Sequence, residues 1–213
     1  MDWLVYVLPQ RYLIHVCSQA KARNAIVGGL DEGNHIVRIS DRVVVKYGYG
    51  VSSGEAATQG YAYRHLDQRR IRVPRVYRFF QDWSDPSWPK GHLVMEYIPG
   101  KTLEEDCGVN VDGAGVARRL ASVVSQLAAV KSSDVPGQVH VGSGGMLQGY
   151  LWGDNGTREV FHFVDDMNRW LNKRLRLIDK LIDLRPYPLA LCHLGLCRRN
   201  VKITEDGTVA LLD

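Results

Sequence analysis

The chain has 213 residues, enough to bury a substantial core as one domain or as two small lobes. Its net charge of +4 is too small to indicate a nucleic-acid partner, although it suits a polyanionic ligand. The apolar start, Trp3 to Cys17, is interrupted by Pro9 and polar residues, so we expect neither an export signal nor a membrane span.

The first half of the chain predicts a small antiparallel sheet with one helix. Apolar alternation and β-branched runs, separated by turn residues, indicate strands at residues 35–39, 42–47, 75–80 and 92–97. Ser52 and Glu55 have the spacing of a capping box, and they predict a helix from Glu55 to about Leu66.

The second half is predicted to be mainly helical. Apolar residues recur at helical spacing from Val116 to Val130, and again from Asp165 to about Leu184. In the second of these helices the residues expected to face inward are Met167, Trp170, Leu171, Leu175, Ile178 and Leu181. Two short strands, Val201–Ile203 and Val209–Leu212, are expected around a turn at 205–207. The fold class is therefore α+β, with one lobe at residues 1–99 and a second at 100–213.

The most informative motif lies at the end of the sequence. His193 precedes Asn200 by seven residues, and Asn200 precedes Asp213 by thirteen, with the predicted strand pair between the last two. Kinases present a metal-binding amide and a metal-binding carboxylate on such a loop and hairpin, because Mg²⁺ prefers oxygen ligands. Two residues after His193, where a catalytic aspartate belongs, this chain has Gly195.

Lys46 and Glu55 form a second candidate constellation. Lys46 ends the apolar run Val43–Val45, and a lysine there is often only a strand-end residue whose charged end reaches solvent. Glu55, in the first turn of the following helix, could form an ion pair with it, as in kinases, or could cap its own helix.

The strand around residues 92–97 runs into Pro99-Gly100. A strand that leaves one lobe for another exposes backbone N–H and C=O groups, which can pair with an adenine edge. By itself this motif is also compatible with an ordinary strand end.

Taken together, the segments RVVVKYG, VPRVY, HLVMEYIPGKTLE, GYLWGDNG, WLNKRL, CHLGLCRRN and TVALLD resemble the aminoglycoside phosphotransferase-like kinases, in particular their fungal-type members. The resemblance covers nearly the whole chain. It implies a bilobal protein-kinase-like fold that binds ATP and Mg²⁺ in the cleft between the lobes, together with an unknown small-molecule acceptor that carries a hydroxyl group.

The resemblance also implies roles for single residues. Lys46 would hold phosphates, Glu55 would orient Lys46, and the strand exit at Met95, Glu96 and Ile98 would meet adenine. Asn200 and Asp213 would bind Mg²⁺, with His193 in the catalytic loop.

Two departures from the family pattern affect the expected activity. Gly195 supplies no proton acceptor, so phosphate transfer to the acceptor hydroxyl is expected to be weak or lost. The chain also ends at Asp213, before the helices that form the family's acceptor site, and we expect a truncated product or a degenerate relative.

Other classes of protein remain as alternatives. The first is a catalytically dead pseudokinase that acts as a binding or scaffold module. The second is a serine hydrolase, because Gly50–Gly54 fits a nucleophile elbow around Ser52, with Asp165 or Asp166 and His193 completing a triad.

A zinc site at Cys192, His193 and Cys197 lacks a fourth ligand at suitable spacing. The four cysteines lie scattered along the chain, which favours a cytoplasmic protein. We expect no nucleic-acid and no membrane partner.

Overall fold

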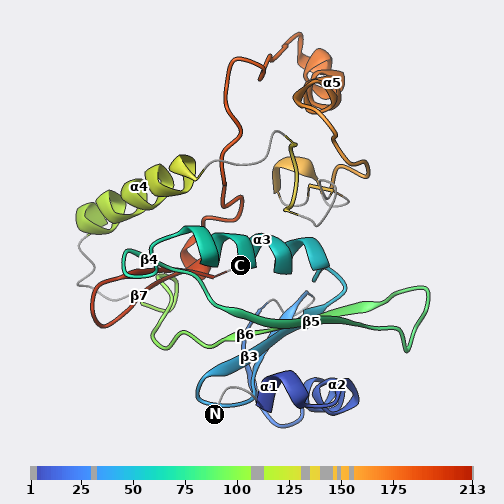
Figure 1. Ribbon diagram of the computed structural model, residues 1–213, viewed down its shortest axis with the longest axis vertical. Coiled ribbons are helices and arrows are strands. Elements are labelled where there is room, and N and C mark those ends of the chain that lie inside the picture. Colours follow the sequence, from blue (N-terminus) through green and yellow to red (C-terminus); the bar gives the residue numbers. More distant parts are fainter. Residues whose placement is uncertain are drawn as a thin grey trace. The chain divides into compact units, whose positions relative to one another are not determined.

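The computed structural model describes residues 4–29, 33–106, 113–130, 135–139, 146–147, 150–153 and 156–212. The chain divides into two compact units: Met1–Tyr63 with Val73–Gly100, and Arg64–Arg72 with Lys101–Asp213. Each unit combines helices and strands, so the predicted α+β class is confirmed (Figure 1).

The first unit is built on a five-stranded antiparallel sheet in the order β1-β2-β3-β6-β5. Its elements are α1 (Leu4–Val7), α2 (Gln10–Ser18), β1 (Ile26–Gly29), β2 (His35–Arg38), β3 (Val43–Gly48), α3 (Ser53–His65), β5 (Val76–Asp82) and β6 (Lys90–Glu96). The predicted hairpin is β2 and β3, in which Val37 pairs with Val45. The predicted helix is α3, and it begins two residues earlier than expected.

Side chains alternate along the central strand β3, and the two faces of the sheet therefore carry different helices. Val43 and Val45 pack with Leu13 and Cys17 of α2. Val44 packs on the opposite face in a cluster that includes Ala56 of α3. The sheet thus lies between α1–α2 and α3 (Figure 1). The sequence patterns did not predict α1 and α2.

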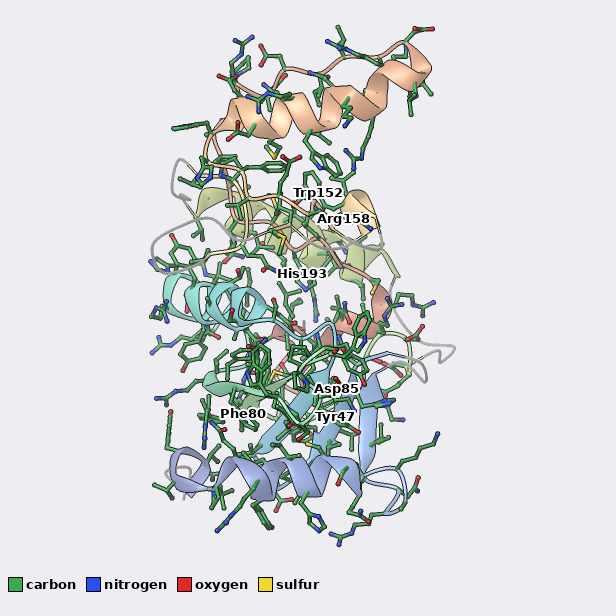
Figure 2. The ribbon with its side chains drawn as sticks, turned by 90° about the vertical axis from the view of Figure 1, so that its right-hand side faces the viewer. Tyr47, Phe80, Asp85, Trp152, Arg158 and His193 are labelled. Atoms are coloured by element: carbon green, nitrogen blue, oxygen red, sulfur yellow. The ribbon has the colours of Figure 1, made fainter. Side chains whose placement is uncertain are left out.

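An aromatic stack forms part of the sheet. The buried ring of His92 in β6 lies between Phe80, at 4.9 Å, and Tyr47, at 5.8 Å between ring centroids (Figure 2). Burial lowers the pKa of His92, and the nearby Asp82 carboxylate opposes this effect only in part.

The second unit contains helices and a small three-stranded sheet in the order β4-β8-β7. Its elements are β4 (Ile71–Arg72), α4 (Gly113–Ala129), η1 (Tyr150–Trp152), α5 (Val164–Leu175), η2 (Arg176–Ile178), η3 (Arg198–Asn200), β7 (Val201–Ile203) and β8 (Val209–Leu211). The strand pair β7–β8 was predicted. The parallel pairing of β4 with β8 was not, because two residues carry no alternation pattern.

Helix α5 is held by an aromatic cluster. Trp170 lies 5.4 Å from Trp152 and 6.3 Å from Phe161 between ring centroids, and Met167 packs beside them (Figure 2). The Trp170 Nε1–H donates to the carbonyl of Thr157 at 3.1 Å. The predicted inward positions of Met167 and Trp170 are confirmed.

The prediction that this helix continues to Leu184 was wrong. Asp179 adopts a left-handed φ of 51°, and the chain then turns back along α5. Asn172 makes two hydrogen bonds to the backbone of Ile182, at 2.8 and 2.9 Å, so its side chain replaces the helical partners of that residue. As a result Ile178 and Leu181, predicted to face inward, are 65% and 72% exposed.

Helix α4 buries only part of its predicted apolar face. Val123 and Leu127 are buried, whereas Val124 is 49% exposed. Within the described residues, no helix is both long and apolar enough to cross a membrane.

Candidate functional site

In the first unit, the sheet and α3 bring Lys46 and Glu55 together. Lys46 is on the same face of β3 as Val44, which is the face that α3 covers. Its Nζ lies 2.8 Å from Glu55 Oε1, and the two side chains are only 8% and 18% exposed. Lys46 is thus a buried cation with a carboxylate partner, and not a strand-end residue that reaches solvent.

The start of α3 explains how Glu55 is positioned. Ser52 Oγ accepts a hydrogen bond from the Glu55 backbone N–H at 3.1 Å, as a helix cap does. This bond sets the first turn of α3, and the Glu55 carboxylate then reaches Lys46. The predicted cap and the predicted ion pair therefore occur together.

The strand β6 places two of the proposed adenine-contacting residues, Met95 and Glu96, on the same sheet. Met95 is buried, and its Sδ accepts a hydrogen bond from Gln59 Nε2 at 3.4 Å. The Glu96 N–H donates to the carbonyl of Arg75, the residue before β5, at 2.9 Å. Ile98 is buried just beyond the strand.

Gln59 is a residue of this region that the sequence patterns did not single out. It is buried on α3, and its Nε2 also donates to the carbonyl of Pro74 at 2.8 Å, which ties the helix to the start of β5. A signal was present, because Gln59 follows Glu55 by four residues and so lies on the same helix face.

In the second unit, one short loop brings His193, Gly195 and Asn200 together. The Gly195 N–H donates to His193 Nδ1 at 3.2 Å. Asn200 Nδ2 donates to the Gly195 carbonyl at 2.9 Å, and the Cys197 N–H donates to the same oxygen at 2.8 Å. Both flanking side chains thus bind the backbone of Gly195, and the loop is ordered although residue 195 has no side chain.

The space at Gly195 is compatible with a side chain. A Cβ added there would lie 3.3 Å from Asn200 Nδ2 and 3.8 Å from His193 Cε1. The backbone of Gly195 is not in the left-handed region. An aspartate at this position therefore requires only a small shift of the Asn200 amide.

The donor set of this loop fits a hard cation. Because Asn200 Nδ2 is bonded to Gly195, the remaining polar atom of the amide is its oxygen, which is a ligand that Mg²⁺ accepts. The hairpin β7–β8 returns to this point, since the Leu212 N–H donates to the Asn200 carbonyl at 2.8 Å. Asp213, the proposed carboxylate ligand, lies outside the described residues.

Other kinds of site find little support in the described part of the chain. It contains no group of three or more His, Cys, Asp or Glu side chains placed to hold a metal ion. For the hydrolase alternative, the strand before Ser52 is antiparallel to both neighbours, whereas a nucleophile elbow follows a parallel strand. Asp166, a proposed triad acid, instead accepts hydrogen bonds from the backbone of His162 and Phe163, which lower its pKa.

Two features together define a kinase-like protein. One is the buried lysine–glutamate pair beside an antiparallel sheet, and the other is the loop from His193 to Asn200 that precedes a hairpin. The sequence matches the phosphotransferase enzyme family (APH) over residues 21–213, and the chain belongs to this family. The resemblance to aminoglycoside phosphotransferases is therefore confirmed. A comparison with curated proteins found no significant match.

Proposed function

We propose that the chain binds Mg-ATP and that phosphate transfer to a hydroxyl acceptor is weak or lost. The observation that carries this proposal is the loop around Gly195. The side chains of His193 and Asn200 make hydrogen bonds to its backbone, yet it supplies no carboxylate. The chain belongs to a family of phosphotransferases, and the proposal rests on the finding that its candidate catalytic loop is formed but lacks this carboxylate.

On the nucleotide side, the Lys46 ammonium would bind phosphate oxygens, and Glu55 would keep it in place. The burial and short distance of this pair support the role, because Glu55 holds the ammonium group in one position. The backbone at Glu96 and Ile98, beside Met95, would bind the adenine.

On the metal side, the oxygen of Asn200 and the carboxylate of Asp213 would be the protein ligands. A bound Mg²⁺ would neutralise charge on the phosphates. The hydrogen bond from Leu212 to Asn200 supports this pairing, since it holds the neighbour of Asp213 at the asparagine. That Lys46 acts on the same nucleotide stays a prediction.

The missing carboxylate bears on catalysis more than on binding. Positioned proton transfer contributes about 10²–10⁴-fold in rate, and glycine cannot accept the proton of an attacking hydroxyl. The chain would then act mainly through nucleotide occupancy, as a pseudokinase-like binding module. The proposal includes a cytoplasmic location, which the scattered cysteines favour.

The test restores the carboxylate. ADP formation from Mg-ATP is measured for the wild type, Gly195→Asp and Gly195→Asn, with water and a panel of small hydroxyl compounds as acceptors. Asparagine matches aspartate in size but accepts no proton at neutral pH. We expect Gly195→Asp to exceed both other proteins by about 10²-fold or more.

Two results would contradict the proposal. One is a wild-type rate typical of kinases, about 1–100 per second. The other is a rate for Gly195→Asp no greater than that for Gly195→Asn, since the missing proton acceptor would then not limit the reaction.

A further inference from the structure

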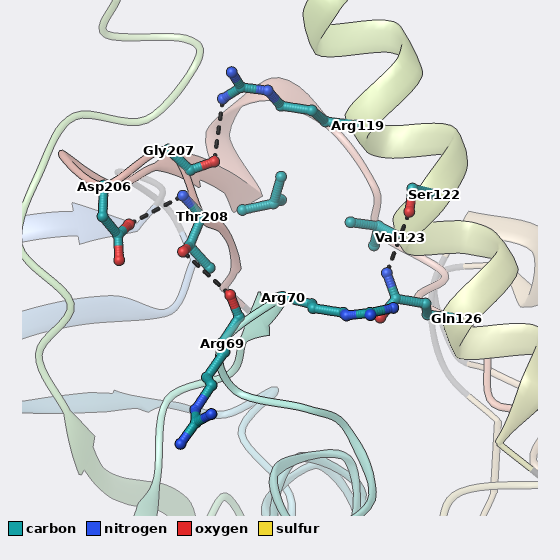
Figure 3. Close-up of a pocket in the computed structure, with 10 residues that line it drawn as sticks. Arg69, Arg70, Arg119, Ser122, Val123, Gln126, Asp206, Gly207 and Thr208 are labelled. Carbon is teal, nitrogen blue, oxygen red and sulfur yellow. Dashed lines mark hydrogen bonds between the residues drawn. The ribbon is translucent and has the colours of Figure 1, made fainter.

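The second unit contains a pocket of about 540 Å³, whose described lining includes no residue of the loop of Gly195 (Figure 3). It lies between α4, the turn of the β7–β8 hairpin and the segment that leads into β4. Its lining includes Arg70, Arg119, Ser122, Gln126 and Thr208. This volume is in the range of pockets that bind small molecules.

Two arginines of the lining extend from different walls of this pocket and in different directions (Figure 3). Arg119 extends from α4 over the hairpin turn, where its Nη1 donates to the Gly207 carbonyl at 3.1 Å. Arg70 extends from the other wall toward α4. The side chain of Arg69, by contrast, leads away from both.

The walls that carry these arginines are held in place by the backbone. Strand β4 pairs with β8, and Thr208 Oγ1 donates to the Arg69 carbonyl at 3.4 Å. Gly207 has a φ of 83°, which favours glycine at the turn. The Arg70 N–H donates to the Asp67 carbonyl at 2.9 Å. The two guanidinium groups thus extend from ordered segments.

Little negative charge opposes them. Within the described residues, no ion pair includes Arg119, and that of Arg70 is a long, exposed one of 3.8 Å to Asp67. Among the lining residues that the structure describes, Asp206 is the only acidic one. Its carboxylate accepts hydrogen bonds from Thr204 Oγ1 and the Thr208 N–H, and these bonds stabilise the hairpin turn. The first of these bonds is the main reason that its pKa falls to about 2.

We propose that this pocket binds a small phosphorylated compound, with Arg70 and Arg119 as the cations that meet its negative charges. Guanidinium groups match phosphate oxygens in geometry, and two of them suit a ligand with at least two negative charges. The Ser122 hydroxyl accepts a hydrogen bond from Gln126 Nε2 at 3.2 Å, and its own O–H would be a further donor to the ligand. The buried Val123 provides an apolar surface for the organic part.

This site is separate from the one proposed for Mg-ATP, because it uses neither Lys46 nor the loop of Gly195. The two proposals can therefore fail independently. Mg-ATP affinity is expected to be the same in the wild type and in variants of the arginine pocket.

The experiment is a calorimetric titration of the whole chain with pyrophosphate, in a phosphate-free buffer with a chelator to remove Mg²⁺. Arg119→Gln and Arg70→Gln are the test variants. Arg118→Gln and Arg64→Gln are matched controls, since each changes an arginine that is exposed like the two test residues but does not line the pocket. Unfolding midpoints without ligand check that all four variants fold.

We expect one site for pyrophosphate in the wild type. Each test variant should weaken binding by about tenfold or more, and each control should change it by less than about twofold. Higher salt should weaken binding in the wild type. Absence of binding, or equal losses in test and control variants, would overturn the proposal. Citrate that binds as tightly as pyrophosphate would overturn the assignment to phosphate.

Discussion

Replacement of Glu55 by alanine should leave the Lys46 ammonium buried without the Glu55 carboxylate. The two charges are 2.8 Å apart in the structure, and their side chains are 8% and 18% exposed. At an effective dielectric constant of about 20, their attraction amounts to about 6 kcal/mol, much of which offsets the cost of removing both from water. Removal of one partner of such a pair costs about 3–5 kcal/mol, and we expect Glu55→Ala to lower the free energy of unfolding by this amount.

The double variant Lys46→Met with Glu55→Leu separates the effect of the buried charge on the free energy of unfolding from the effect of lost packing. Because it removes both charges and keeps the apolar volume, its stability should lie within about 1 kcal/mol of the wild type or above it. Glu55→Gln is the matched control, since it keeps the size of the side chain and loses only the charge. Its cost should fall between those of the other two.

The assay is urea-induced unfolding at neutral pH, with circular dichroism and tryptophan fluorescence as independent probes. Coincident transitions would justify the use of one free energy for each variant. The reasoning would be refuted if Glu55→Ala cost less than about 1 kcal/mol, or if the double variant were the least stable of the set. Either result would mean that Lys46 is not a desolvated cation.

Two further predictions concern the cores of the two units. Because the pKa of His92 is lowered in the folded chain, the unfolded chain binds a proton at His92 at a higher pH than the folded chain does. The contribution of the neutral His92 ring to stability is therefore present above pH about 6.5 and is lost as the pH falls below it. Between a pH above and a pH below this value, the urea midpoint should therefore fall more in the wild type than in His92→Phe, which keeps the stacking. An equal fall in both proteins would contradict this prediction. In the second unit, Trp170→Ala should cost about 3–5 kcal/mol, whereas Leu177→Ala, at a residue that is 86% exposed, should cost less than about 0.5 kcal/mol. Similar costs for the two would show that the aromatic cluster is not the core of this unit.

Local patterns were sufficient to predict much of the sheet. The β-branched run that ends at Lys46 indicated β3, and the capping box at Ser52 indicated the start of α3 within two residues. These features depend on residues that are close in sequence, and such residues largely determine strand alternation and helix caps.

Contacts between residues that are distant in the sequence could not be predicted from the local patterns. Helix α5 ends early because Asn172 binds the backbone of Ile182, ten residues later, and apolar spacing gives no sign of this. Likewise, β4 exists only because β8 lies beside it. The placement of Arg70 and Arg119 around one pocket depends on that same pairing, so charge patterns could not reveal it.

The candidate catalytic loop was predicted in part. The spacing of His193, Gly195 and Asn200 indicated a common loop, because kinase loops of this kind carry such residues. It did not indicate that both side chains bind the Gly195 backbone, which is a matter of rotamers within the folded loop.

The most direct test of the central claim is the thermal unfolding of the wild type with ATP, in the presence and absence of Mg²⁺. A ligand that binds only the folded state stabilises it by about 2.7 kcal/mol at a hundredfold excess over its dissociation constant. We predict a shift of the unfolding temperature that requires Mg²⁺ and is lost in Asp213→Ala, but is kept in the control Glu205→Ala on the exposed hairpin turn. No shift in the wild type, or the same shift in Asp213→Ala, would contradict the account.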